Sequence, residues 1–499
     1  MKRLLTLLFI LLIVKNVSSQ QWSYEYPIND NEYVIFITGD MSLNYNYVFG
    51  TIYIEDTNMS HPVALCFADD GCCKERIFDN GFDGESFITS VGLGDGNVFV
   101  AASCSDDAES KTCEKIWIAV LNPDLDIIAE KYLDYEEPYI AFGLSSHALL
   151  NDNKEIVFVT KVTDSITEHV ITEYDFLFYK IDINCNLLKQ SYLENPSRYS
   201  DISDFIKVPN TNCYAMYSNG MTPLGVETVS YVDDELNYLS TTIIDDFDNY
   251  PNNILPMFVC VDYWYDQSHF LMSAISSNTD GINDWHPLVL KMDTEMNIQK
   301  TLSLERIDTT DYVSQFRSMA YVNQEKIYIS TFWQNMSYFE FYPNTATVFL
   351  INDDLEILGR KDFDFGEYMN ILYIQPTYDE GCIIHVLFEY DDYTQMVIYK
   401  LNVDDFEMLT DIEECEEDFE VRLSPNPASS VLNIDVDDMM DKEANVTIFD
   451  MLGRSRMDRD VSLDGNTVTL DVSILEKGMY FCVMTIDERR VLRKKFVKE

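Results

Sequence analysis

Residues 120–128 read VLNPDLDII and residues 180–188 read KIDINCNLL, and this pattern of an aliphatic run, an acidic or amide turn and a second apolar run decides the fold. Asp and Asn favour such turns because their side chains hydrogen-bond to the nearby backbone. Two apolar runs on either side of a short turn are typical of a β-hairpin. The same pattern recurs as YVDDELNYL (231–239), KMDTEMNIQ (291–299), LINDDLEIL (350–358) and KLNVDDFEML (400–409), with a weaker copy, LCFADDGCC, at 65–73.

The spacing of these hairpins predicts the architecture. The first turn residues are Asn122, Asp182, Asp233, Asp293, Asn352 and Asn402, so the copies are 60, 51, 60, 59 and 50 residues apart, and Ala68 lies 54 residues before the first. Another β-rich run precedes each copy, which makes a unit of roughly four short strands, the size of one propeller blade. We therefore expect an all-β chain with a β-propeller of about seven blades over residues 20–408. Six or eight blades stay open, since the first copy is irregular.

A ring of blades has two ends that must pair with each other. We expect an N-terminal strand such as Tyr33–Thr38 to supply this closure. The chain contains 32 Tyr and 29 Phe, which fall largely in the expected strands, and we interpret most of them as packing between blades.

Residues 421–499 differ from the body in charge and pattern. They hold 12 Lys/Arg and 14 Asp/Glu, whereas residues 20–420 hold 19 Lys/Arg and 72 Asp/Glu. Short alternating runs separated by turn residues predict a small Ig-like β-sandwich. The prolines of Ser424-Pro425-Asn426-Pro427 favour an extended entry into its first edge strand.

This tail resembles the C-terminal sorting domain of proteins exported by the type IX secretion system of the Bacteroidetes. The resemblance lies in three stretches in the family's order, SPNPASSVLNI (424–434), VTIFDMLGRSRM (446–457) and LDVSILEKGMYFCVMTIDERRVLRKKFVKE (470–499). It implies recognition by an outer-membrane translocon, removal by a sortase-like peptidase and often attachment to surface lipopolysaccharide. A plain accessory sandwich is the alternative. The residues that match the family's motifs are Ser424, Pro425, Asn426, Pro427, Gly453, Arg454, Leu475, Gly478, Tyr480, Lys494 and Lys495.

The N-terminus agrees with export. Lys2 and Arg3 precede an apolar run, and Val17-Ser18-Ser19 offers small residues for cleavage, so residues 1–19 are predicted to be a signal peptide. No other stretch approaches a membrane span, and we expect a secreted or cell-surface protein. The acidic stretch LTDIEECEEDFE at 409–420 is predicted to be a solvated linker.

Oxygen side chains at alternate turn positions suggest a cation site. Carboxylate and amide oxygens at such spacing are able to converge on Ca²⁺ when a loop folds inward. The same residues also suit an ordinary hairpin turn, and none of the stretches continues as an EF-hand loop. A body charge of about −53 adds a reason to bind calcium, because a cation relieves self-repulsion. The weak candidates are Asn122, Asp124, Asp126, Asp182, Asn184 and Asn186.

The same charge disfavours nucleic acid, anionic polysaccharide and lipid headgroups as partners of the body. A cationic protein or a neutral glycan is favoured instead, and a glycan would stack on exposed aromatic rings. The aromatic candidates are Tyr263-Trp264-Tyr265 and Trp285, in segments that we expect at one mouth of the propeller, with blade-edge capping as the alternative.

Sequence motifs for catalysis are missing. The chain has no Gly-x-Ser-x-Gly elbow, no His-Glu-x-x-His and no Gly-rich phosphate loop, and its six histidines are scattered, which we interpret as incidental. The 11 cysteines form no zinc pattern, although Cys66, Cys72 and Cys73 flank a turn and Cys104 with Cys113 would close a short loop.

We therefore expect an exported binding or scaffold propeller of unknown ligand. One alternative is a glycan-acting hydrolase with a carboxylate pair in the propeller channel, and another is a spacer that binds nothing itself.

Overall fold

The computed structural model divides the chain into two compact units, Met1–Met408 and Leu409–Glu499, which are described separately below. The predicted signal peptide and the acidic linker fall outside the described residues. The described residues are 22–28, 31–68, 71–106, 115–134, 140–163, 175–195, 200–208, 211–220, 227–244, 260–264, 269–277, 285–293, 297–304, 310–313, 317–334, 345–364, 368–389, 394–408, 421–436, 442–450, 455–463, 467–475, 477–486 and 490–498.

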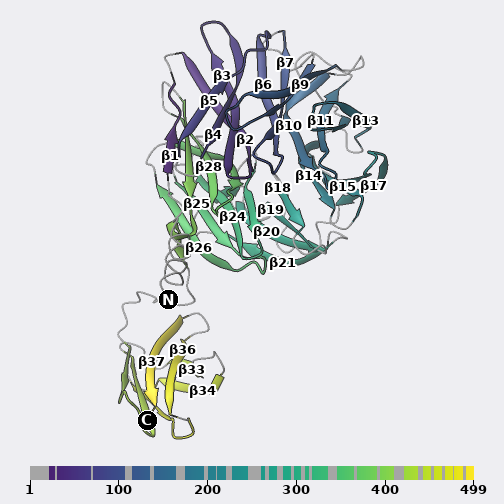
Figure 1. Ribbon diagram of the computed structural model, residues 1–499. Helices are drawn as coiled ribbons and strands as arrows, with labels where there is room; N and C mark the ends of the chain where they lie inside the picture. Colours follow the sequence, from purple (N-terminus) through teal and green to yellow (C-terminus); the bar gives the residue numbers. More distant parts are fainter. Residues whose placement is uncertain are drawn as a thin grey trace, which may run out of the picture. The chain divides into compact units, whose positions relative to one another are not determined.

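The N-terminal unit is a β-propeller, and its described strands form seven antiparallel blades around a ring (Figure 1). From the innermost strand outward, the first four blades are β2 (Glu32–Ser42), β3 (Tyr45–Ile54), β4 (Met59–Phe67) and β5 (Cys73–Ile77); β6 (Gly84–Gly92), β7 (Val98–Ser105), β8 (Lys115–Leu121) and β9 (Ile127–Asp134); β10 (Ile140–Leu150), β11 (Ile156–Thr163), β12 (Asp175–Ile181) and β13 (Leu187–Leu193); and β14 (Ser200–Val208), β15 (Cys213–Gly220), β16 (Glu227–Asp233) and β17 (Tyr238–Ile244).

The last three blades follow the same order with two irregularities. Blade 6 has a divided innermost strand and a short extra strand at its outer edge, and blade 7 takes its outermost strand from the start of the chain. They consist of β18 (Cys260–Trp264), β19 (His269–Ser277), β20 (Trp285–Asp293) and β21 (Ile298–Ser303); β22 (Thr310–Val313) with β23 (Met319–Asn323), β24 (Lys326–Gln334), β25 (Thr345–Ile351), β26 (Ile357–Asp364) and β30 (Glu407–Met408); and β27 (Tyr368–Pro376), β28 (Cys382–Glu389), β29 (Thr394–Leu401) and β1 (Trp22–Glu25).

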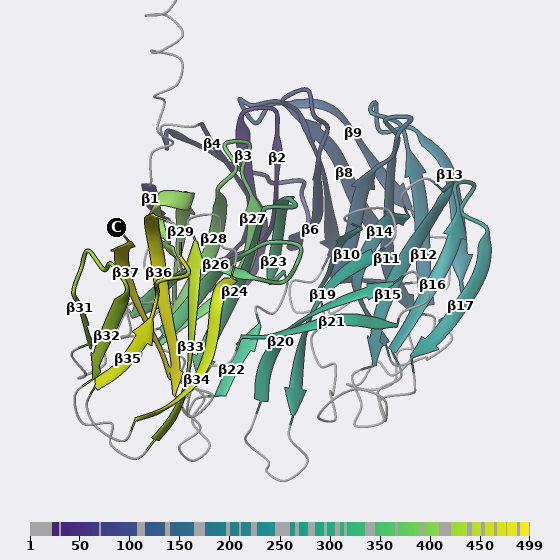
Figure 2. The ribbon, with the colours of Figure 1, turned by 90° about the horizontal axis from the view of Figure 1, so that it is seen from below.

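The ring is closed on its inner side, because each innermost strand contacts the innermost strand of the next blade and β27 contacts β2. On the outer side β1 pairs with β29, so the first described strand completes the last blade, as Figure 2 shows. The prediction of a seven-bladed ring closed by an N-terminal strand is thus confirmed. The predicted strand was wrong, however. Tyr33–Thr38 lies inside β2, and the strand that pairs with β29 is the preceding β1, Trp22–Glu25.

The hydrophobic core consists of one cluster at each interface between blades, seven in all over the described residues. A blade packs on both faces, so its middle strands are apolar at successive positions and do not alternate with polar residues. In β11, Ile156 and Phe158 pack towards blade 2, whereas Val157 and Val159 pack towards blade 4. The continuous runs IVFV and IWIAVL therefore follow from burial on both faces.

The repeated hairpin joins the third and fourth strands of a blade, and its turn has one geometry in several blades. The Oδ1 atom of Asn122 accepts N–H groups from Asp124 and Asp126, both at 2.9 Å, and Asp182 does the same for Asn184 and Asn186 at 2.9 and 2.8 Å. The residue two positions before the second strand of the hairpin has a positive φ, near 60°, and yet is a buried apolar residue. This left-handed conformation costs about 1–2 kcal/mol for a residue with a Cβ, which burial between blades offsets. The positive-φ residues are Leu125, Cys185, Leu236 and Leu355.

The C-terminal unit is a β-sandwich of two antiparallel sheets. One sheet has the order β31 (Val421–Ser424), β32 (Val431–Val436) and β35 (Thr467–Asp471), and the other has the order β34 (Ser455–Leu463), β33 (Lys442–Asp450), β36 (Gly478–Ile486) and β37 (Arg490–Lys498). A core that includes Leu432, Ile448, Cys482 and Phe496 lies between them. The predicted Ig-like sandwich is consistent with this arrangement.

Among the described residues there is no helix long and apolar enough to cross a membrane. Cys66 and Cys73 are free thiols. The bridge that the sequence allowed around the 65–73 turn is therefore not formed, and Cys113 lies outside the described residues.

Candidate functional site

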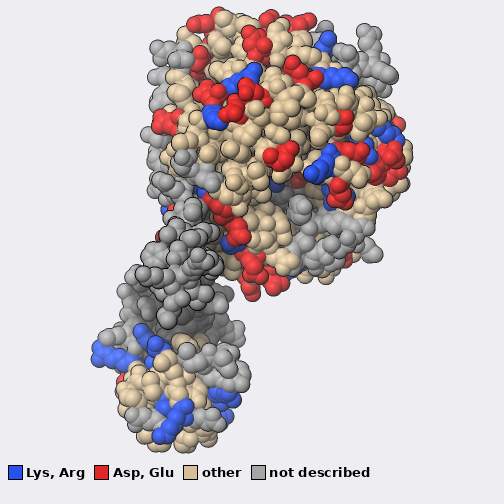
Figure 3. Space-filling model, viewed as in Figure 1, with Lys and Arg blue, Asp and Glu red and all other residues tan. Residues whose placement is uncertain are grey.

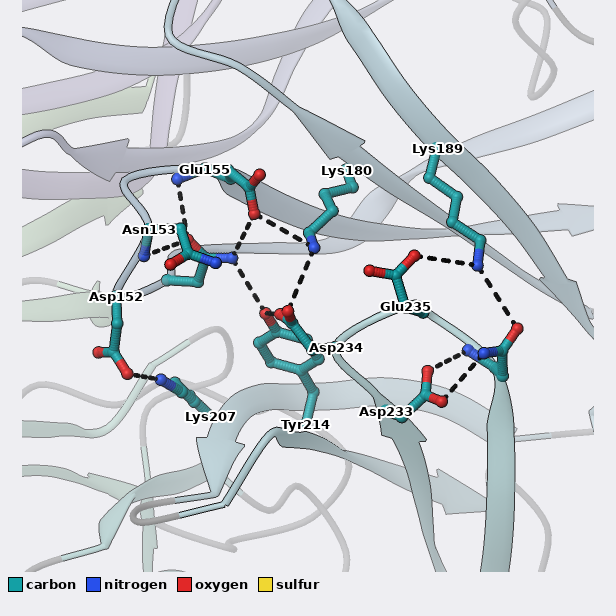
Figure 4. A network of polar contacts seen from close by, with 12 residues as sticks. Asp152, Asn153, Glu155, Lys180, Lys189, Lys207, Tyr214, Asp233, Asp234 and Glu235 are labelled. Atoms are coloured by element: carbon teal, nitrogen blue, oxygen red, sulfur yellow. Dashed lines mark hydrogen bonds and ion pairs between the residues drawn. The ribbon is translucent and has the colours of Figure 1, made fainter.

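The end of the propeller that carries the tight hairpin turns is closed by polar contacts between blades. Figure 4 shows the best developed example, between blades 3 and 4. The Lys180 ammonium lies 3.2 Å from Glu155 of its own blade and 3.4 Å from Asp234 in the turn of the next blade. Tyr214 donates its hydroxyl hydrogen to Asp234 at 2.7 Å, and Asn151 donates to Glu155 at 2.9 Å.

The Lys180 side chain is 7% exposed, so this contact is largely desolvated. Burial acts to lower the pKa of the Lys180 ammonium, but Glu155 and Asp234 outweigh it, and the pKa is raised overall. The lysine therefore stays charged and holds two blades together.

Equivalent contacts recur around the ring. Lys291 of blade 5 lies 3.1 Å from Asp353 in the turn of blade 6, whereas Lys400 pairs with Asp379 within blade 7. Nearer the surface, further bases of one blade bind an adjacent blade, through the pairs Lys74–Asp124, Arg76–Asp126, Lys189–Glu235, Lys207–Asp152 and Lys326–Glu380.

The scarce bases of the body are thus concentrated on structural contacts at this end. On the face in Figure 3, blue side chains of the body mostly lie beside red ones, whereas the charged side chains visible on the described surface of the C-terminal unit are mainly blue. In the described turns named above, these polar groups bond to their own backbone or to a neighbouring blade.

The calcium candidates lie in these turns. The side-chain oxygens of Asn122 and Asp182 accept backbone N–H groups of the turn, and the carboxylates of Asp124 and Asp126 pair with Lys74 and Arg76. Within the described part of the chain, no group of three or more His, Cys, Asp or Glu is arranged to hold a metal ion. The calcium site stays a prediction from the sequence, and the geometry gives these oxygens a role in the hairpins.

The inner edges of the blades form a second polar region. Each innermost strand contains a β-bulge, for example between Ile202 and Asp204 in β14 and between Ile371 and Tyr373 in β27. Bulges re-aim the side chains that follow them and are frequent beside functional sites. The residues that directly follow these bulges include polar and ionisable ones, such as Asp204 and Tyr373.

One network of hydrogen bonds joins blades 6, 7 and 1. The Arg317 guanidinium donates to the Tyr373 hydroxyl at 3.3 Å, and that hydroxyl donates to the carbonyl oxygen of Gly39 at 3.1 Å. Next to Gly39, Asp40 accepts the N–H groups of Met41 at 2.7 Å and Gly92 at 2.8 Å. Burial raises the pKa of the Asp40 carboxyl, although the Gly92 N–H and the Arg317 guanidinium act in the opposite direction.

A second polar group joins blades 3 and 4. His147 of β10 and Asp204 of β14 approach to 3.4 Å between Nδ1 and Oδ1. The scattered histidines of the sequence were interpreted as incidental, and no spacing signal could have paired residues 57 positions apart on different blades. This pair was therefore missed.

The aromatic candidates are not brought together. Tyr263 and Trp264 end β18, where Trp264 pairs with Phe270, and Trp285 begins β20, where it pairs with Ser277. These positions are at opposite ends of β19, so the expectation of one common mouth is wrong for the backbone. Their side chains, and all of Tyr265, fall outside what the structure describes.

In the C-terminal unit, the opening and closing motifs meet. The Oδ1 atom of Asn426 accepts the N–H of Val497 at 2.9 Å, and Ala428 donates its N–H to the carbonyl oxygen of Val497 at 2.8 Å. Tyr480 stacks on Phe496 with ring centroids 5.7 Å apart.

The other motif residues have distinct positions. Leu475 is buried, Gly478 begins β36, and Lys494 and Lys495 are exposed on β37. The opening motif is also exposed, at the end of β31 and directly after it, and consists of Ser424, Pro425, Asn426 and Pro427. Gly453 and Arg454 lie outside the described residues.

Comparison with protein families decides the nature of this unit. Residues 422–499 match the family described as secretion system C-terminal sorting domain. The C-terminal unit is a type IX sorting domain. The sorting domain indicates export to the outer surface or the medium and interaction with the type IX secretion machinery. The predicted resemblance and localisation are thereby confirmed.

No curated protein matches the chain. Among solved structures, acylaminoacyl peptidase from Pyrococcus horikoshii is similar at 13% identity and a TM-score of 0.44, covering 82% of this chain and 58% of the peptidase. The β-propeller domain of the trilobed protease from Pyrococcus furiosus has 10% identity and a TM-score of 0.43, covering 78% of this chain and 98% of that domain. A polysaccharide lyase of the ulvan lyase type has 8% identity and a TM-score of 0.41, covering 72% and 90%. The propeller assignment rests on the strand topology described above.

Proposed function

We propose that the propeller is an extracellular binding module for a cationic or neutral ligand, which the sorting domain delivers to the cell exterior. Surface attachment after removal of the sorting domain by a sortase-like peptidase is part of the same proposal. A binding role suits a fold whose blades form a rigid ring and leave loops and inner edges for recognition.

One observation carries the proposal, namely the difference between the two ends of the ring. At one end the turns are short, and their polar groups bond to their own backbone or to the next blade. The connections at the other end are longer, as between β11 and β12 or β24 and β25. Saturated turns favour a structural role for the first end, which leaves the inner edges and the second end for a partner.

The charge of the body sets the class of partner. A formal charge of about −53 attracts cations and repels polyanions, so a basic protein or a neutral glycan fits better than nucleic acid. The proposal is tested by incubating the mature secreted protein on glycan and protein arrays, with and without a chelator. Retention of a glycan or basic protein supports a binding role. No retention in either condition would instead favour a propeller that acts only as a spacer and binds nothing itself.

The hydrolase alternative has one observation in its favour. Asp40 is a carboxyl on the innermost strand of blade 1 whose pKa is raised by burial, as a general acid requires. Both of its oxygens accept backbone N–H groups, however, which favours a structural role. Release of reducing sugar that disappears in Asp40→Asn or Asp204→Asn, with the fold retained, would establish the alternative.

The export part of the proposal has its own test. Deleting residues 421–499 is expected to leave the propeller folded but retained within the cell envelope. The truncated chain would be followed by immunoblotting of medium and cell fractions, and normal yield in the medium would contradict the assigned export route.

A further inference from the structure

His147 and Asp204 face each other across the inner side of the interface between blades 3 and 4. His147 follows the bulge in β10, and Asp204 follows the bulge in β14. The Nδ1 atom of the imidazole lies 3.4 Å from Oδ1 of the carboxylate. The bulges in both strands therefore aim two ionisable groups from different blades at each other.

The exposure of this pair distinguishes it from two buried polar links between blades. Thr38 bonds to Ser90 across blades 1 and 2, and Ser273 bonds to Ser318 across blades 5 and 6, and all four residues are buried. The His147 side chain is 26% exposed and that of Asp204 is 16% exposed. Unlike those two links, the His147–Asp204 pair is open to solvent.

The hydrogen bonds leave two acceptor atoms available. Asp204 Oδ1 accepts the backbone N–H of Phe205 at 2.7 Å and faces His147 Nδ1. A carboxylate at Nδ1 favours the tautomer with the hydrogen on that nitrogen, so that Nε2 carries a lone pair. The remaining acceptors are Asp204 Oδ2 and His147 Nε2, and among the described residues no Lys or Arg pairs with this carboxylate.

We propose that His147 and Asp204 form the binding position for an ammonium or guanidinium group of a cationic ligand. Asp204 Oδ2 accepts a hydrogen bond from such a group, whose charge complements both Asp204 and the acidic body, and the contact between His147 Nδ1 and Oδ1 holds the carboxylate in place. Lys207, on the same strand as Asp204, supports the assignment because its ammonium is already paired with Asp152 in a blade 3 turn. The inference rests on the proposed binding function and gives it a site and a ligand class.

The test uses the full mature protein and a fluorescent pentalysine peptide, with the fully acetylated peptide as the uncharged probe. Binding is measured by fluorescence anisotropy at physiological salt, because salt screens unspecific attraction to exposed acids. We expect Asp204→Asn to weaken pentalysine binding about tenfold and His147→Gln to weaken it severalfold, since loss of one charge-assisted contact has this size. The acetylated peptide is expected not to bind.

Two matched variants control for charge and for histidine content. Glu55→Gln removes one exposed negative charge from blade 1, and His269→Ala removes a histidine from the tight-turn end of blade 5, and both are expected to change affinity less than twofold. Thermal unfolding of each variant confirms that the fold is retained.

Wild-type affinity in both Asp204→Asn and His147→Gln would overturn this site while leaving the binding function intact. Equal losses in Asp204→Asn and Glu55→Gln would also overturn it, since attraction would then be a property of net charge. Absence of any binding by the wild type on the arrays would instead refute the proposed function. Movement of the ¹⁵N resonance of His147 Nε2 on addition of pentalysine provides an independent readout, and an unchanged resonance would count against the site.

Discussion

The indole of Trp22 stacks on the ring of Phe67 with centroids 4.5 Å apart, and this contact ties the strand that completes blade 7 to blade 1. Tyr24 meets the same ring edge-on, and the Tyr26 hydroxyl donates to Glu75 at 2.7 Å. The N-terminal strand therefore links the two ends of the ring. Its backbone pairs with β29 of blade 7, and its aromatic side chains pack on Phe67 of blade 1.

Deleting residues 20–26 should open the ring. The loss of the β1 pairing and of buried Tyr26 is expected to lower the free energy of unfolding by about 3 kcal/mol or more. Chemical denaturation would measure the loss, and the synthetic peptide QWSYEYP added in trans should recover part of it. Ser23→Ala, at an exposed position of β1, is the control. Unchanged stability after the deletion would show that the inner strands alone close the ring.

Replacing Lys180 by Met should destabilise the propeller by about 1–3 kcal/mol, because Glu155 and Asp234 would then lie together without a cation. The matched control is Lys207→Met, which removes a surface pair whose partner, Asp152, is 88% exposed. An exposed pair is worth about 0–1 kcal/mol. Urea titrations of the three proteins would compare these losses, and equal effects would refute the role assigned to the buried lysine.

Stability should depend on the protonation of Glu85, which is buried at the start of β6. Its carboxylate accepts N–H groups from Asn80 at 3.0 Å and Phe82 at 3.2 Å, and His61 lies 4.0 Å away. Burial raises the pKa of Glu85 to about 7. In the folded state this carboxyl binds its proton more tightly than in the unfolded state, so its contribution to stability falls as pH rises from about 4.5 through 7.

Glu85→Gln should remove this dependence. The amide oxygen still accepts from the loop, and no charge needs to be buried, so the variant is expected to gain on the order of 2 kcal/mol relative to wild type at pH 8 and little at pH 4.5. Unfolding free energies at both pH values measure the difference. A gain of the same size at both would mean that burial of the charge is not the cause.

The turn residues should act without calcium. Asn122→Ala and Asp182→Ala each remove an oxygen that accepts two backbone N–H groups, which is expected to cost about 1–2 kcal/mol. The geometry predicts the same loss in EDTA and in CaCl₂ at matched ionic strength. A melting temperature that rises with calcium in the wild type, but not in these variants, would instead support the cation site expected from the sequence.

Much of the fold could be predicted because it is periodic. A turn such as the one at Asn122 is a local device, set by a side chain that bonds to its own backbone, and its recurrence every 50–60 residues reports one blade per copy. The sorting domain was equally accessible, because motifs such as Ser424-Pro425-Asn426-Pro427 are contiguous in sequence. The closing strand was misplaced because Tyr33–Thr38 and Trp22–Glu25 are similar β-rich segments, and only the free edge of β29 distinguishes them.

The candidate site was beyond local reasoning. His147 and Asp204, or Arg317 and Tyr373, come from different blades, and their approach depends on where each bulge shifts the register of an innermost strand. The aromatic candidates were grouped wrongly for the same reason. Trp264 and Trp285 are close in sequence, but β19 runs between them, so they pair with its opposite ends.

The amino-acid sequence by itself determined the class of the two units, the repeat and the route out of the cell, because hairpin chemistry, strand periodicity and export motifs act over a few neighbouring residues. Tertiary structure alone decided which strand completes the last blade, which lysines link the blades and which ionisable groups meet at the inner edge. Those outcomes depend on contacts between residues far apart in the chain, and such contacts exist only once the ring has formed.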